Sequence, residues 1–440
     1  MRNRLRCIVS VFVAGLLLSA ALSACGQKTA ATSALEKRPV QLAFWTLQLS
    51  EFSGVIQPML DDFEKAHPTV HVHWVDIPFS EGEKRTLTAI LSPEVPDIVN
   101  LNPDFSAILA SRNALVNMAD ALTPAERAVY LPVAWQAATL RRPGKKSRPL
   151  TFGLPWYITS SVTFYNKALL ARAGLKAPPR NYDELVRMAP ELHRKTDAYT
   201  LMPTLTERGN FLKELQKVGV TLHNPATGQF NLAVPEAFRH LTRMVDLYRN
   251  GGMPAEALTE GHRSAVDRYQ SGTLAMLMAG PNFLNIVKEN APAVFEQTGV
   301  MPQFPIGAPT RDFSMMVLVV PRHSRHPREA LELARWITNA GNQLALAKAA
   351  PVLPATTASL ADPYFNAPAT PDDVTAVARG ISASQLKEAR AAYQIQPGQQ
   401  RMNEWMDYFV QMALLGKLRA DEALTRAEGE LNTVLKEETP

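Results

Sequence analysis

The sequence predicts an α/β fold that is divided between two domains. The chain has 440 residues, more than one hydrophobic core usually organises. Segments that alternate apolar and polar residues take turns with segments of helical periodicity, first over residues 40–101 and again from residue 153 onward. This alternation is typical of an open, mostly parallel sheet covered by helices.

The first hundred residues contain three predicted strands with helices between them. The strands are Val40–Trp45, Val70–Val75 and Asp97–Leu101. Apolar residues recur at helical spacing over Phe52–Phe63 and again over Leu87–Leu91. Pro58 falls within the first helical pattern and is expected to kink or restart that helix, because proline lacks the amide hydrogen that a helix interior needs.

The stretch Gly153–Lys167 is the segment around which the rest of the chain is organised. Residues 162–165 alternate in character, which predicts a strand with two different faces, and a helical pattern ending at Gly174 follows it. Trp156 and Tyr157 stand side by side near its beginning and are expected to be exposed. Packing does not require two adjacent aromatic residues there, so this pair is the first candidate for ligand contact.

Further strands and helices are predicted toward the C-terminus. Asn181 and Glu184 have the spacing of a helix N-cap. Apolar strands are predicted at Leu274–Met278 and Phe313–Val320. The proline-rich segment Val300–Gly307 is predicted to be extended and to cross between the domains. From Pro371 onward the pattern is helical.

The first residues have the pattern of an export signal. The basic stretch Met1–Arg6 precedes the apolar Ile8–Leu22, which is too short for a comfortable membrane span. The sequence LSAC, ending at Cys25, resembles the lipobox of bacterial lipoproteins, and this implies that Cys25 is lipidated. Residues 1–24 would be the signal peptide and 25–38 a flexible tether. An ordinary secretory leader with an incidental cysteine is the alternative.

Charge and cysteine content narrow the classes of function. The formal net charge is +5, but loss of Arg2, Arg4 and Arg6 with the leader leaves 43 basic against 41 acidic residues, a net charge of +2. Nucleic-acid binding therefore has no support from charge. Cys7 would also leave with the leader, so the mature protein has no disulfide to make. The basic segment Arg141–Pro149 is predicted to be an exposed, solvated loop rather than an anion site.

Motifs for catalysis or metal binding are weak. His67, His71 and His73 lie close together, but no carboxylate is placed to complete a metal site with them. The acidic pairs Asp61-Asp62 and Asp372-Asp373 lie in helical contexts where neighbours point in different directions, so they are poor candidates for paired acid–base catalysis. We therefore expect a protein that is not an enzyme and that has no metal site and no cofactor.

Eight short motifs occur in order after the leader. They are Phe63-Glu64-Lys65, Pro96-Asp97-Ile98, Gly153-Leu154-Pro155, Tyr165-Asn166-Lys167, Pro179 with Tyr182–Leu185, Ala275-Met276 with Gly280-Pro281, Pro302–Gly307 and Asp421–Leu424. Each motif is weak alone. In this order, behind a lipobox, they resemble the family 1 extracellular solute-binding proteins, the substrate-capturing components of bacterial ABC importers, most often for carbohydrates.

The resemblance implies an α/β, two-lobed periplasmic-binding-protein clamshell that is class II-like and maltose-binding-protein-like, with multiple hinge crossings. The N-terminal lobe would comprise residues 39–152 plus 306–352, and the C-terminal lobe residues 153–305 plus 353–440. Crossings are expected near Phe152–Pro155, Met301–Ile306 and Val352–Pro354. A ligand would lie between the lobes, which close over it because both lobes contact it.

The resemblance also implies ligand contacts. Sugars offer flat C–H faces to aromatic side chains and hydroxyl groups that need polar partners. The expected contacts are Trp45, Gln48, Asn102, Asp104, Trp156, Tyr157, Thr159, Arg208, Asn282, Ser314, Arg401 and Trp405. Core packing is the alternative role for Trp45, and a helix N-cap is the alternative for Asp104. The segment Phe79–Glu81 is a loop that could also reach the cleft.

Two of these positions depart from the family pattern. Asn282 stands where many relatives have a tryptophan that stacks on sugar, and Ser314 stands in a segment where relatives tend to have glycines. These departures leave the class of sugar open.

The expected function is that of a substrate-binding lipoprotein of an ABC importer. It would capture a mono- or oligosaccharide and deliver it to transmembrane permease subunits. We expect a monomer that is exported to the cell envelope and anchored to the membrane by lipid, facing either a periplasm or the medium. A secreted glycan-active hydrolase and a sensor or adhesion lipoprotein with the same fold are the alternatives, and a polyol or phosphodiester is the alternative ligand.

Overall fold

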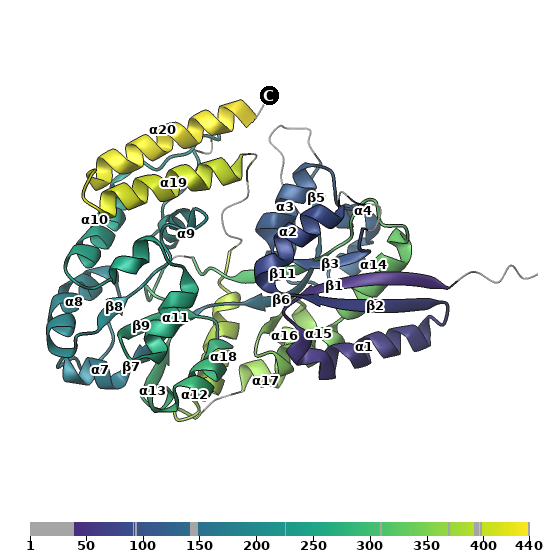
Figure 1. The fold of residues 1–440 in the computed structure, drawn as a ribbon, viewed down its shortest axis with the longest axis horizontal. Coiled ribbons are helices and arrows are strands. Elements are labelled where there is room, and N and C mark those ends of the chain that lie inside the picture. The colour runs from purple at the N-terminus through teal and green to yellow at the C-terminus, as the bar shows by residue number, and fades with distance from the viewer. Residues whose placement is uncertain are drawn as a thin grey trace, which may run out of the picture. The chain divides into compact units, whose positions relative to one another are not determined.

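Two main β-sheets with helices around them make up the described part of the chain in the computed structural model (Figure 1). The structure describes residues 39–438 except 91, 93–94, 141–147, 225, 309, 368–369, 391–395 and 397. The predicted signal peptide, the tether and Cys25 lie outside the described residues, as does most of the basic segment Arg141–Pro149.

The larger sheet has six strands in the order β12-β6-β11-β3-β1-β2. They are β1 (Val40–Leu47), β2 (Val70–Ile77), β3 (Ile98–Leu101), β6 (Leu154–Thr159), β11 (Ser314–Val319) and β12 (Leu353–Pro354). Strand β1 is parallel to β2 and β3, but β11 is antiparallel to β3 and β6, and β12 is antiparallel to β6. The predicted strands are confirmed. The expectation of a mostly parallel sheet is wrong, because β11 enters this sheet from the other one in the opposite direction.

The second main sheet has four strands in the order β10-β7-β9-β8. They are β7 (Val162–Asn166), β8 (Tyr199–Leu201), β9 (Leu274–Ala279) and β10 (Thr298–Met301), and a separate pair is formed by β4 (Thr139–Leu140) and β5 (Leu150–Thr151). Strand β9 is parallel to β8 and antiparallel to β7, which is antiparallel to β10. The stretch Gly153–Lys167 thus supplies β6 to one sheet and β7 to the other.

The helices beside the first sheet include those predicted around Phe52–Phe63 and Leu87–Leu91 and several that the sequence did not indicate. They include η1 (Ser50–Phe52), α1 (Ser53–Ala66), α2 (Phe79–Ile90), α3 (Pro103–Ser111), α4 (Met118–Ala121), α5 (Pro124–Arg127), α6 (Pro132–Ala137), α14 (Pro327–Ile337), α15 (Ala340–Ala349), α16 (Thr357–Leu360) and α17 (Pro363–Asn366). Helix α1 runs through Pro58 without a restart. Its buried face, which includes Leu60 and Phe63, holds the helix on the sheet despite the hydrogen bond that proline removes.

The second group of helices packs around the four-stranded sheet. It comprises α7 (Lys167–Arg172), α8 (Tyr182–Thr196), α9 (Asn210–Lys217), α10 (Pro235–Arg249), η2 (Ala255–Leu258), α11 (His262–Gln270), α12 (Phe283–Asn290), α13 (Pro292–Glu296), α18 (Val374–Leu386), α19 (Gln399–Leu414) and α20 (Ala420–Glu438). The Asn181 side chain accepts a hydrogen bond from the Glu184 amide and caps α8, and Gly174 has a φ of 80° after α7. Both predicted caps are confirmed.

Each main sheet has its own hydrophobic core. One cluster surrounds the four-stranded sheet and includes Phe164 and Tyr269. Two clusters cover the faces of the six-stranded sheet, and β6 contributes Trp156 to one and Ile158 to the other. Residues two apart in a regular strand share a face, so this separation reflects the register shift between β6 and β11 at Trp156. Separate cores define two lobes.

The chain crosses between the sheets at three places. It crosses between β6 and β7, between β10 and β11, and again between β12 and α18. The crossing expected near Met301–Ile306 coincides with the second. The expected crossings at Phe152–Pro155 and Val352–Pro354 fall on β6 and β12, so the chain crosses after these strands. The predicted lobe boundaries assign both strands to the C-terminal lobe and stay a prediction.

Candidate functional site

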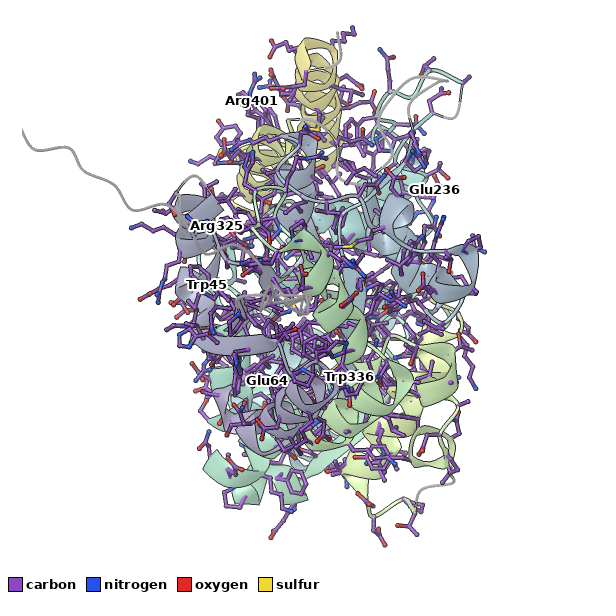
Figure 2. All side chains as sticks on the ribbon, turned by 90° about the vertical axis from the view of Figure 1, so that its right-hand side faces the viewer. Trp45, Glu64, Glu236, Arg325, Trp336 and Arg401 are labelled. Atoms are coloured by element: carbon purple, nitrogen blue, oxygen red, sulfur yellow. The ribbon has the colours of Figure 1, made fainter. Side chains whose placement is uncertain are left out.

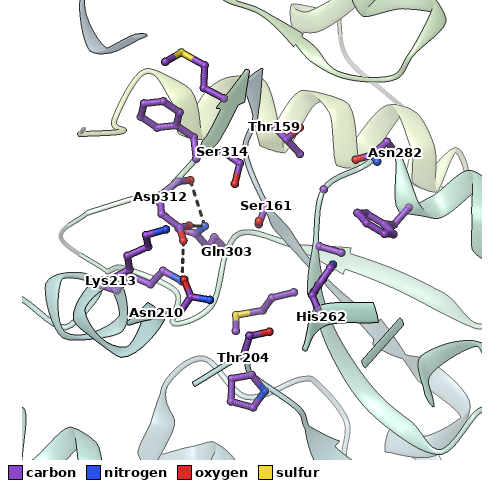
Figure 3. A pocket seen from close by; sticks show the side chains of 18 of the residues that line it. Thr159, Ser161, Thr204, Asn210, Lys213, His262, Asn282, Gln303, Asp312 and Ser314 are labelled. Atoms are coloured by element: carbon purple, nitrogen blue, oxygen red, sulfur yellow. Dashed lines mark hydrogen bonds and ion pairs between the residues drawn. The ribbon is translucent and has the colours of Figure 1, made fainter. Parts of the chain in front are cut away.

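A cavity of about 600 Å³ opens where the crossing segments meet both sheets (Figure 3). Its wall includes Thr159 and Ser161 at the first crossing, Gln303 and Asp312 at the second, and Ser314 at the start of β11. Residues of α9 and of the loop between β9 and α12 complete it, so segments far apart in sequence build one site. Cavities of this size suit small-molecule ligands.

Two smaller cavities adjoin the main one. The first, of about 280 Å³, shares Phe79, Lys213 and the segment Phe313–Met316 with the main cavity. The next, of about 400 Å³, shares Asp104, Arg208 and Lys213 with the first. The three cavities are therefore neighbours that share parts of their walls.

Aromatic and sulfur-containing side chains form the apolar part of the main cavity. They are Phe79, Tyr157, Phe283, Phe313, Met202, Met278, Met315 and Met316. Phe79 is 53% exposed although it is large and apolar. It lies in the first turn of α2 and not in the predicted loop. Methionine and aromatic surfaces can pack against the C–H faces of a ligand.

A buried ionic group forms one wall of the cavity. Lys217 Nζ lies 2.7 Å from Glu214 Oε1 and 3.0 Å from Asp312 Oδ2. Burial opposes the charged form of Lys217, but the carboxylates of Asp312 and Glu214 outweigh it and raise the pKa of the lysine. Burial likewise opposes the charge on Glu214, and Lys217 outweighs it and lowers the pKa of that carboxyl. Lys217 is thus paired with both carboxylates, and the three side chains together carry a net charge of −1.

Four predicted contacts line the main cavity: Tyr157, Thr159, Asn282 and Ser314. Burial, followed by the charge of Asp76, raises the pKa of the Tyr157 hydroxyl, which stays protonated. The Asn282 Oδ1 atom is buried and has no hydrogen-bond partner among the described residues. Thr159 and Asn282 approach Gly280 so closely that a Cβ atom there would lie 2.2 Å from Thr159 Cγ2, so a larger residue at this position would displace the side chains that line the cavity.

Asn102, Asp104 and Arg208 line the adjoining cavities. The Asn102 side chain caps α3 by accepting from the Phe105 amide at 2.8 Å, so the cap role considered for Asp104 belongs to Asn102. Arg208 Nη1 lies 3.1 Å from Glu83 Oε1, and Asn102 Nδ2 donates to the same oxygen at 3.0 Å.

The remaining predicted contacts, Trp45, Gln48, Trp156, Arg401 and Trp405, are not among the residues that line these cavities. Trp156 is fully buried and packs against Phe44, so its predicted exposure is wrong. The reason is that β6 lies inside a sheet whose two faces are both covered.

Trp45 and Arg401 belong to different parts of the fold (Figure 2). Trp45 lies on β1 with the Arg85 guanidinium 6.0 Å from its ring. Arg401 on α19 forms an ion pair of 2.8 Å with Glu437. Trp405, also on α19, stacks on Phe409 with ring centroids 5.8 Å apart.

Several cavity residues were missed by sequence reasoning. They include Asn210, Lys213, Glu214, Lys217, His262, Phe283, Gln303 and Asp312. Helix α9 carries four of them, and its sequence reads as an ordinary amphipathic helix. The spacing of these residues does not distinguish side chains that face the cavity from side chains that face solvent.

The described part of the chain contains neither a candidate metal site nor a candidate membrane-spanning helix. No group of three or more His, Cys, Asp or Glu side chains among the described residues is arranged to hold a metal ion. His71 instead lies 3.2 Å from Glu64 Oε2. None of the described helices is both long and apolar enough to cross a bilayer.

Two lobes joined by three crossings, with an open cavity at those crossings, define a two-lobed ligand-binding protein. Residues 47–344 match the family described as bacterial extracellular solute-binding protein. The chain belongs to this family, and the family and fold expected from the sequence are confirmed.

Two known relatives are named as binding proteins. A “Probable ABC transporter-binding protein” of Deinococcus radiodurans is 25% identical over 242 residues, 52% of this chain and 55% of the relative, so the chain spans about half of that relative's length. A “Multiple sugar-binding protein” of Streptococcus mutans is 22% identical over 338 residues, 74% of this chain and 76% of the relative.

One solved structure has a higher sequence identity to this chain than these two relatives have. It is that of a “putative oligosaccharide periplasmic-binding protein” from Synechococcus sp. MITs9220, in complex with zinc. Its identity to this chain is 33% with a TM-score of 0.81, and the match covers 91% of this chain and 100% of that one.

Proposed function

We propose that this chain is the solute-capturing component of an ABC importer and that its ligand is carbohydrate-like. The observation that carries the proposal is the lining of the 600 Å³ cavity. Hydroxyl and amide side chains stand beside aromatic and methionine surfaces, while the buried charges on the wall are paired with each other. This surface fits a neutral molecule with C–H faces and hydroxyl groups, because each buried hydroxyl needs a partner. The names of the relatives support the same ligand class.

The proposed contacts divide between the cavities. Tyr157, Thr159, Asn282 and Ser314 contact the solute in the main cavity. Asn102, Asp104 and Arg208 contact a longer solute that extends into the adjoining cavities. Trp45, Gln48, Arg401 and Trp405 stay predictions from the family resemblance. The site binds and releases the solute without chemical change, so the protein is not an enzyme.

The proposed setting is the cell envelope. Residues 1–24 direct export, a lipid on Cys25 anchors the protein to the membrane, and residues 25–38 are the tether. The tethered monomer delivers its solute to the transmembrane subunits of the permease. The family described as extracellular supports export, and the lipobox-like LSAC sequence supports the anchor.

Calorimetric titration of the purified protein with glucose, maltose, sucrose, trehalose and raffinose tests the function. We expect heat of binding and a raised melting temperature with at least one of them. A further test places Ser314→Trp in the cavity, where the indole should abolish binding, against Ser111→Trp on the exposed end of α3, which should not. The absence of binding by the wild-type protein to all five sugars would contradict the carbohydrate assignment. Unchanged affinity in Ser314→Trp would contradict the site.

A further inference from the structure

His262 lines the main cavity, although no sequence pattern singles it out (Figure 3). It is the first residue of α11, and its ring meets Phe283 edge-to-face with centroids 5.1 Å apart and planes at 88°. None of the described residues forms a hydrogen bond with its ring nitrogens, and neither nitrogen is fully buried. The imidazole is therefore held by packing and keeps its hydrogen-bonding capacity.

The surroundings of His262 favour its uncharged form. Burial lowers its pKa below the ordinary value of 6.5. Strand β9, which packs against α11, carries apolar side chains only (LAMLMA). On the neighbouring loop, the Glu207 carboxylate lies beside Gly261. The other charged groups of this cavity are Lys213 and the group formed by Lys217, Glu214 and Asp312.

A neutral imidazole has one donor and one acceptor nitrogen. A sugar hydroxyl also both donates and accepts, so the two groups are matched. An imidazolium ring only donates, so a solute hydroxyl group that donates its hydrogen bond to the ring would lose that bond when the ring is protonated.

We propose that His262 is a further specificity-determining residue, whose uncharged ring hydrogen-bonds a hydroxyl group of the captured solute, so that the cavity loses affinity in acid. The inference rests on the proposed function, since it names a contact for the same solute. It assigns the site a preference for neutral, hydroxyl-bearing ligands and a release that acidification assists.

The test is calorimetric titration from pH 4.5 to pH 7.5 with whichever of the five sugars named above binds the wild-type protein. The variants are His262→Phe, which keeps the ring contact but has no polar atom, and His262→Gln, which keeps a donor and an acceptor but does not titrate. His73→Gln, at an exposed position on β2, is the matched control. Circular dichroism melting verifies that each variant is folded.

We expect His262→Phe to weaken binding roughly twofold to tenfold at pH 7.5, as loss of one hydrogen bond does. His262→Gln should bind nearly as tightly as the wild type at pH 7.5 and should lose less affinity in acid. The control should follow the wild type at every pH. Equal affinity of His262→Phe and wild type at pH 7.5, or the same acid loss in His262→Gln as in the wild type, would overturn the inference and leave the carbohydrate assignment intact. Failure of the wild type to bind any sugar would overturn the proposed function and this inference with it.

Discussion

At the scale of single residues, the cavity wall contains a lysine that is paired with two carboxylates. Lys217 is 7% exposed and Glu214 is 9% exposed, and the Tyr182 hydroxyl donates to Glu214 at 2.9 Å. Removal of one partner from such a group leaves a buried charge without compensation, which is more costly than removal of the whole group.

We therefore expect Lys217→Met to destabilise the protein by about 3–5 kcal/mol, because Glu214 would keep its burial and lose its counter-charge. Urea unfolding followed by circular dichroism measures the change. Lys65→Met is the matched control, because Lys65 pairs with Asp62 on the exposed side of α1 and its loss should be hardly measurable. A loss no larger in Lys217→Met than in the control would show that the buried charges are not coupled.

Asp407 lines the cavity of about 400 Å³ and is expected to make the free energy of unfolding depend on pH. Burial raises its pKa from 3.8 to about 6, although the Gly209 amide donates to it at 3.0 Å. The folded protein thus binds this proton more tightly than the unfolded chain does, so Asp407 makes the free energy of unfolding fall as pH rises from about 4 to about 6.

Asp407→Asn should remove this part of the pH dependence and stabilise the protein above pH 6 relative to the wild type. Urea unfolding between pH 4 and pH 7 measures it, with Asp372→Asn at an exposed position as the control. Parallel pH profiles for wild type and Asp407→Asn would contradict the prediction.

Residue types at the ends of strands allowed part of the site to be predicted. Tyr157, Thr159 and Ser314 lie on β6 and β11. The residues of α9 could not be found, because their helix presents its polar side to the cavity as other helices present theirs to water. Trp156 was misplaced because the sequence does not state that β6 is covered on both faces.

At the scale of secondary-structure elements, α18 joins two of the three crossings. Gln385 Oε1 accepts from the Gln303 amide at 2.5 Å, and its Nε2 donates to the Ser161 carbonyl at 2.9 Å. Ser382 Oγ donates to the Ser160 carbonyl at 2.6 Å. One face of this helix thus holds both crossings in place.

We expect Gln385→Leu to cost roughly 1–3 kcal/mol for each backbone group that it leaves unpaired, and to speed amide hydrogen exchange at Gln303. Exchange measured by NMR or mass spectrometry checks this locally, and urea unfolding checks it globally. Gln57→Leu, on the exposed side of α1, should change neither quantity. Exchange at Gln303 as slow as in the wild type would exclude a bracing role for Gln385.

Periodicity predicted the longer strands β1, β2, β7, β9 and β11, and residue type predicted the caps at Gly174 and Asn181, because apolar spacing and capping residues act locally. It did not predict strand direction. The direction of β11 depends on where the chain was 13 residues earlier, at the end of β10 in the other sheet. Local sequence patterns do not show from which direction a strand enters its sheet.

At the scale of the whole molecule, separate cores and shared crossings predict that solute binding draws the lobes together. Closure is favoured only by contacts that both lobes make with the solute. Small-angle scattering should therefore show a smaller radius of gyration when the wild-type protein is saturated with a sugar that binds, and no change for Ser314→Trp in the same sugar. An unchanged radius for the saturated wild-type protein would contradict closure.

The position of β11 between β6 and β3 has a consequence for biosynthesis. This inner strand begins at Ser314, after more than two thirds of the 440 residues have been made. Until then β3 lacks its partner on one side and β6 lacks both of its partners, since β12 is made later still, so a truncated chain ending earlier would expose unpaired strand edges. Most of the polypeptide must therefore be synthesised before the six-stranded sheet can be completed. For the exported chain proposed above, this late completion would keep the precursor incompletely folded during export.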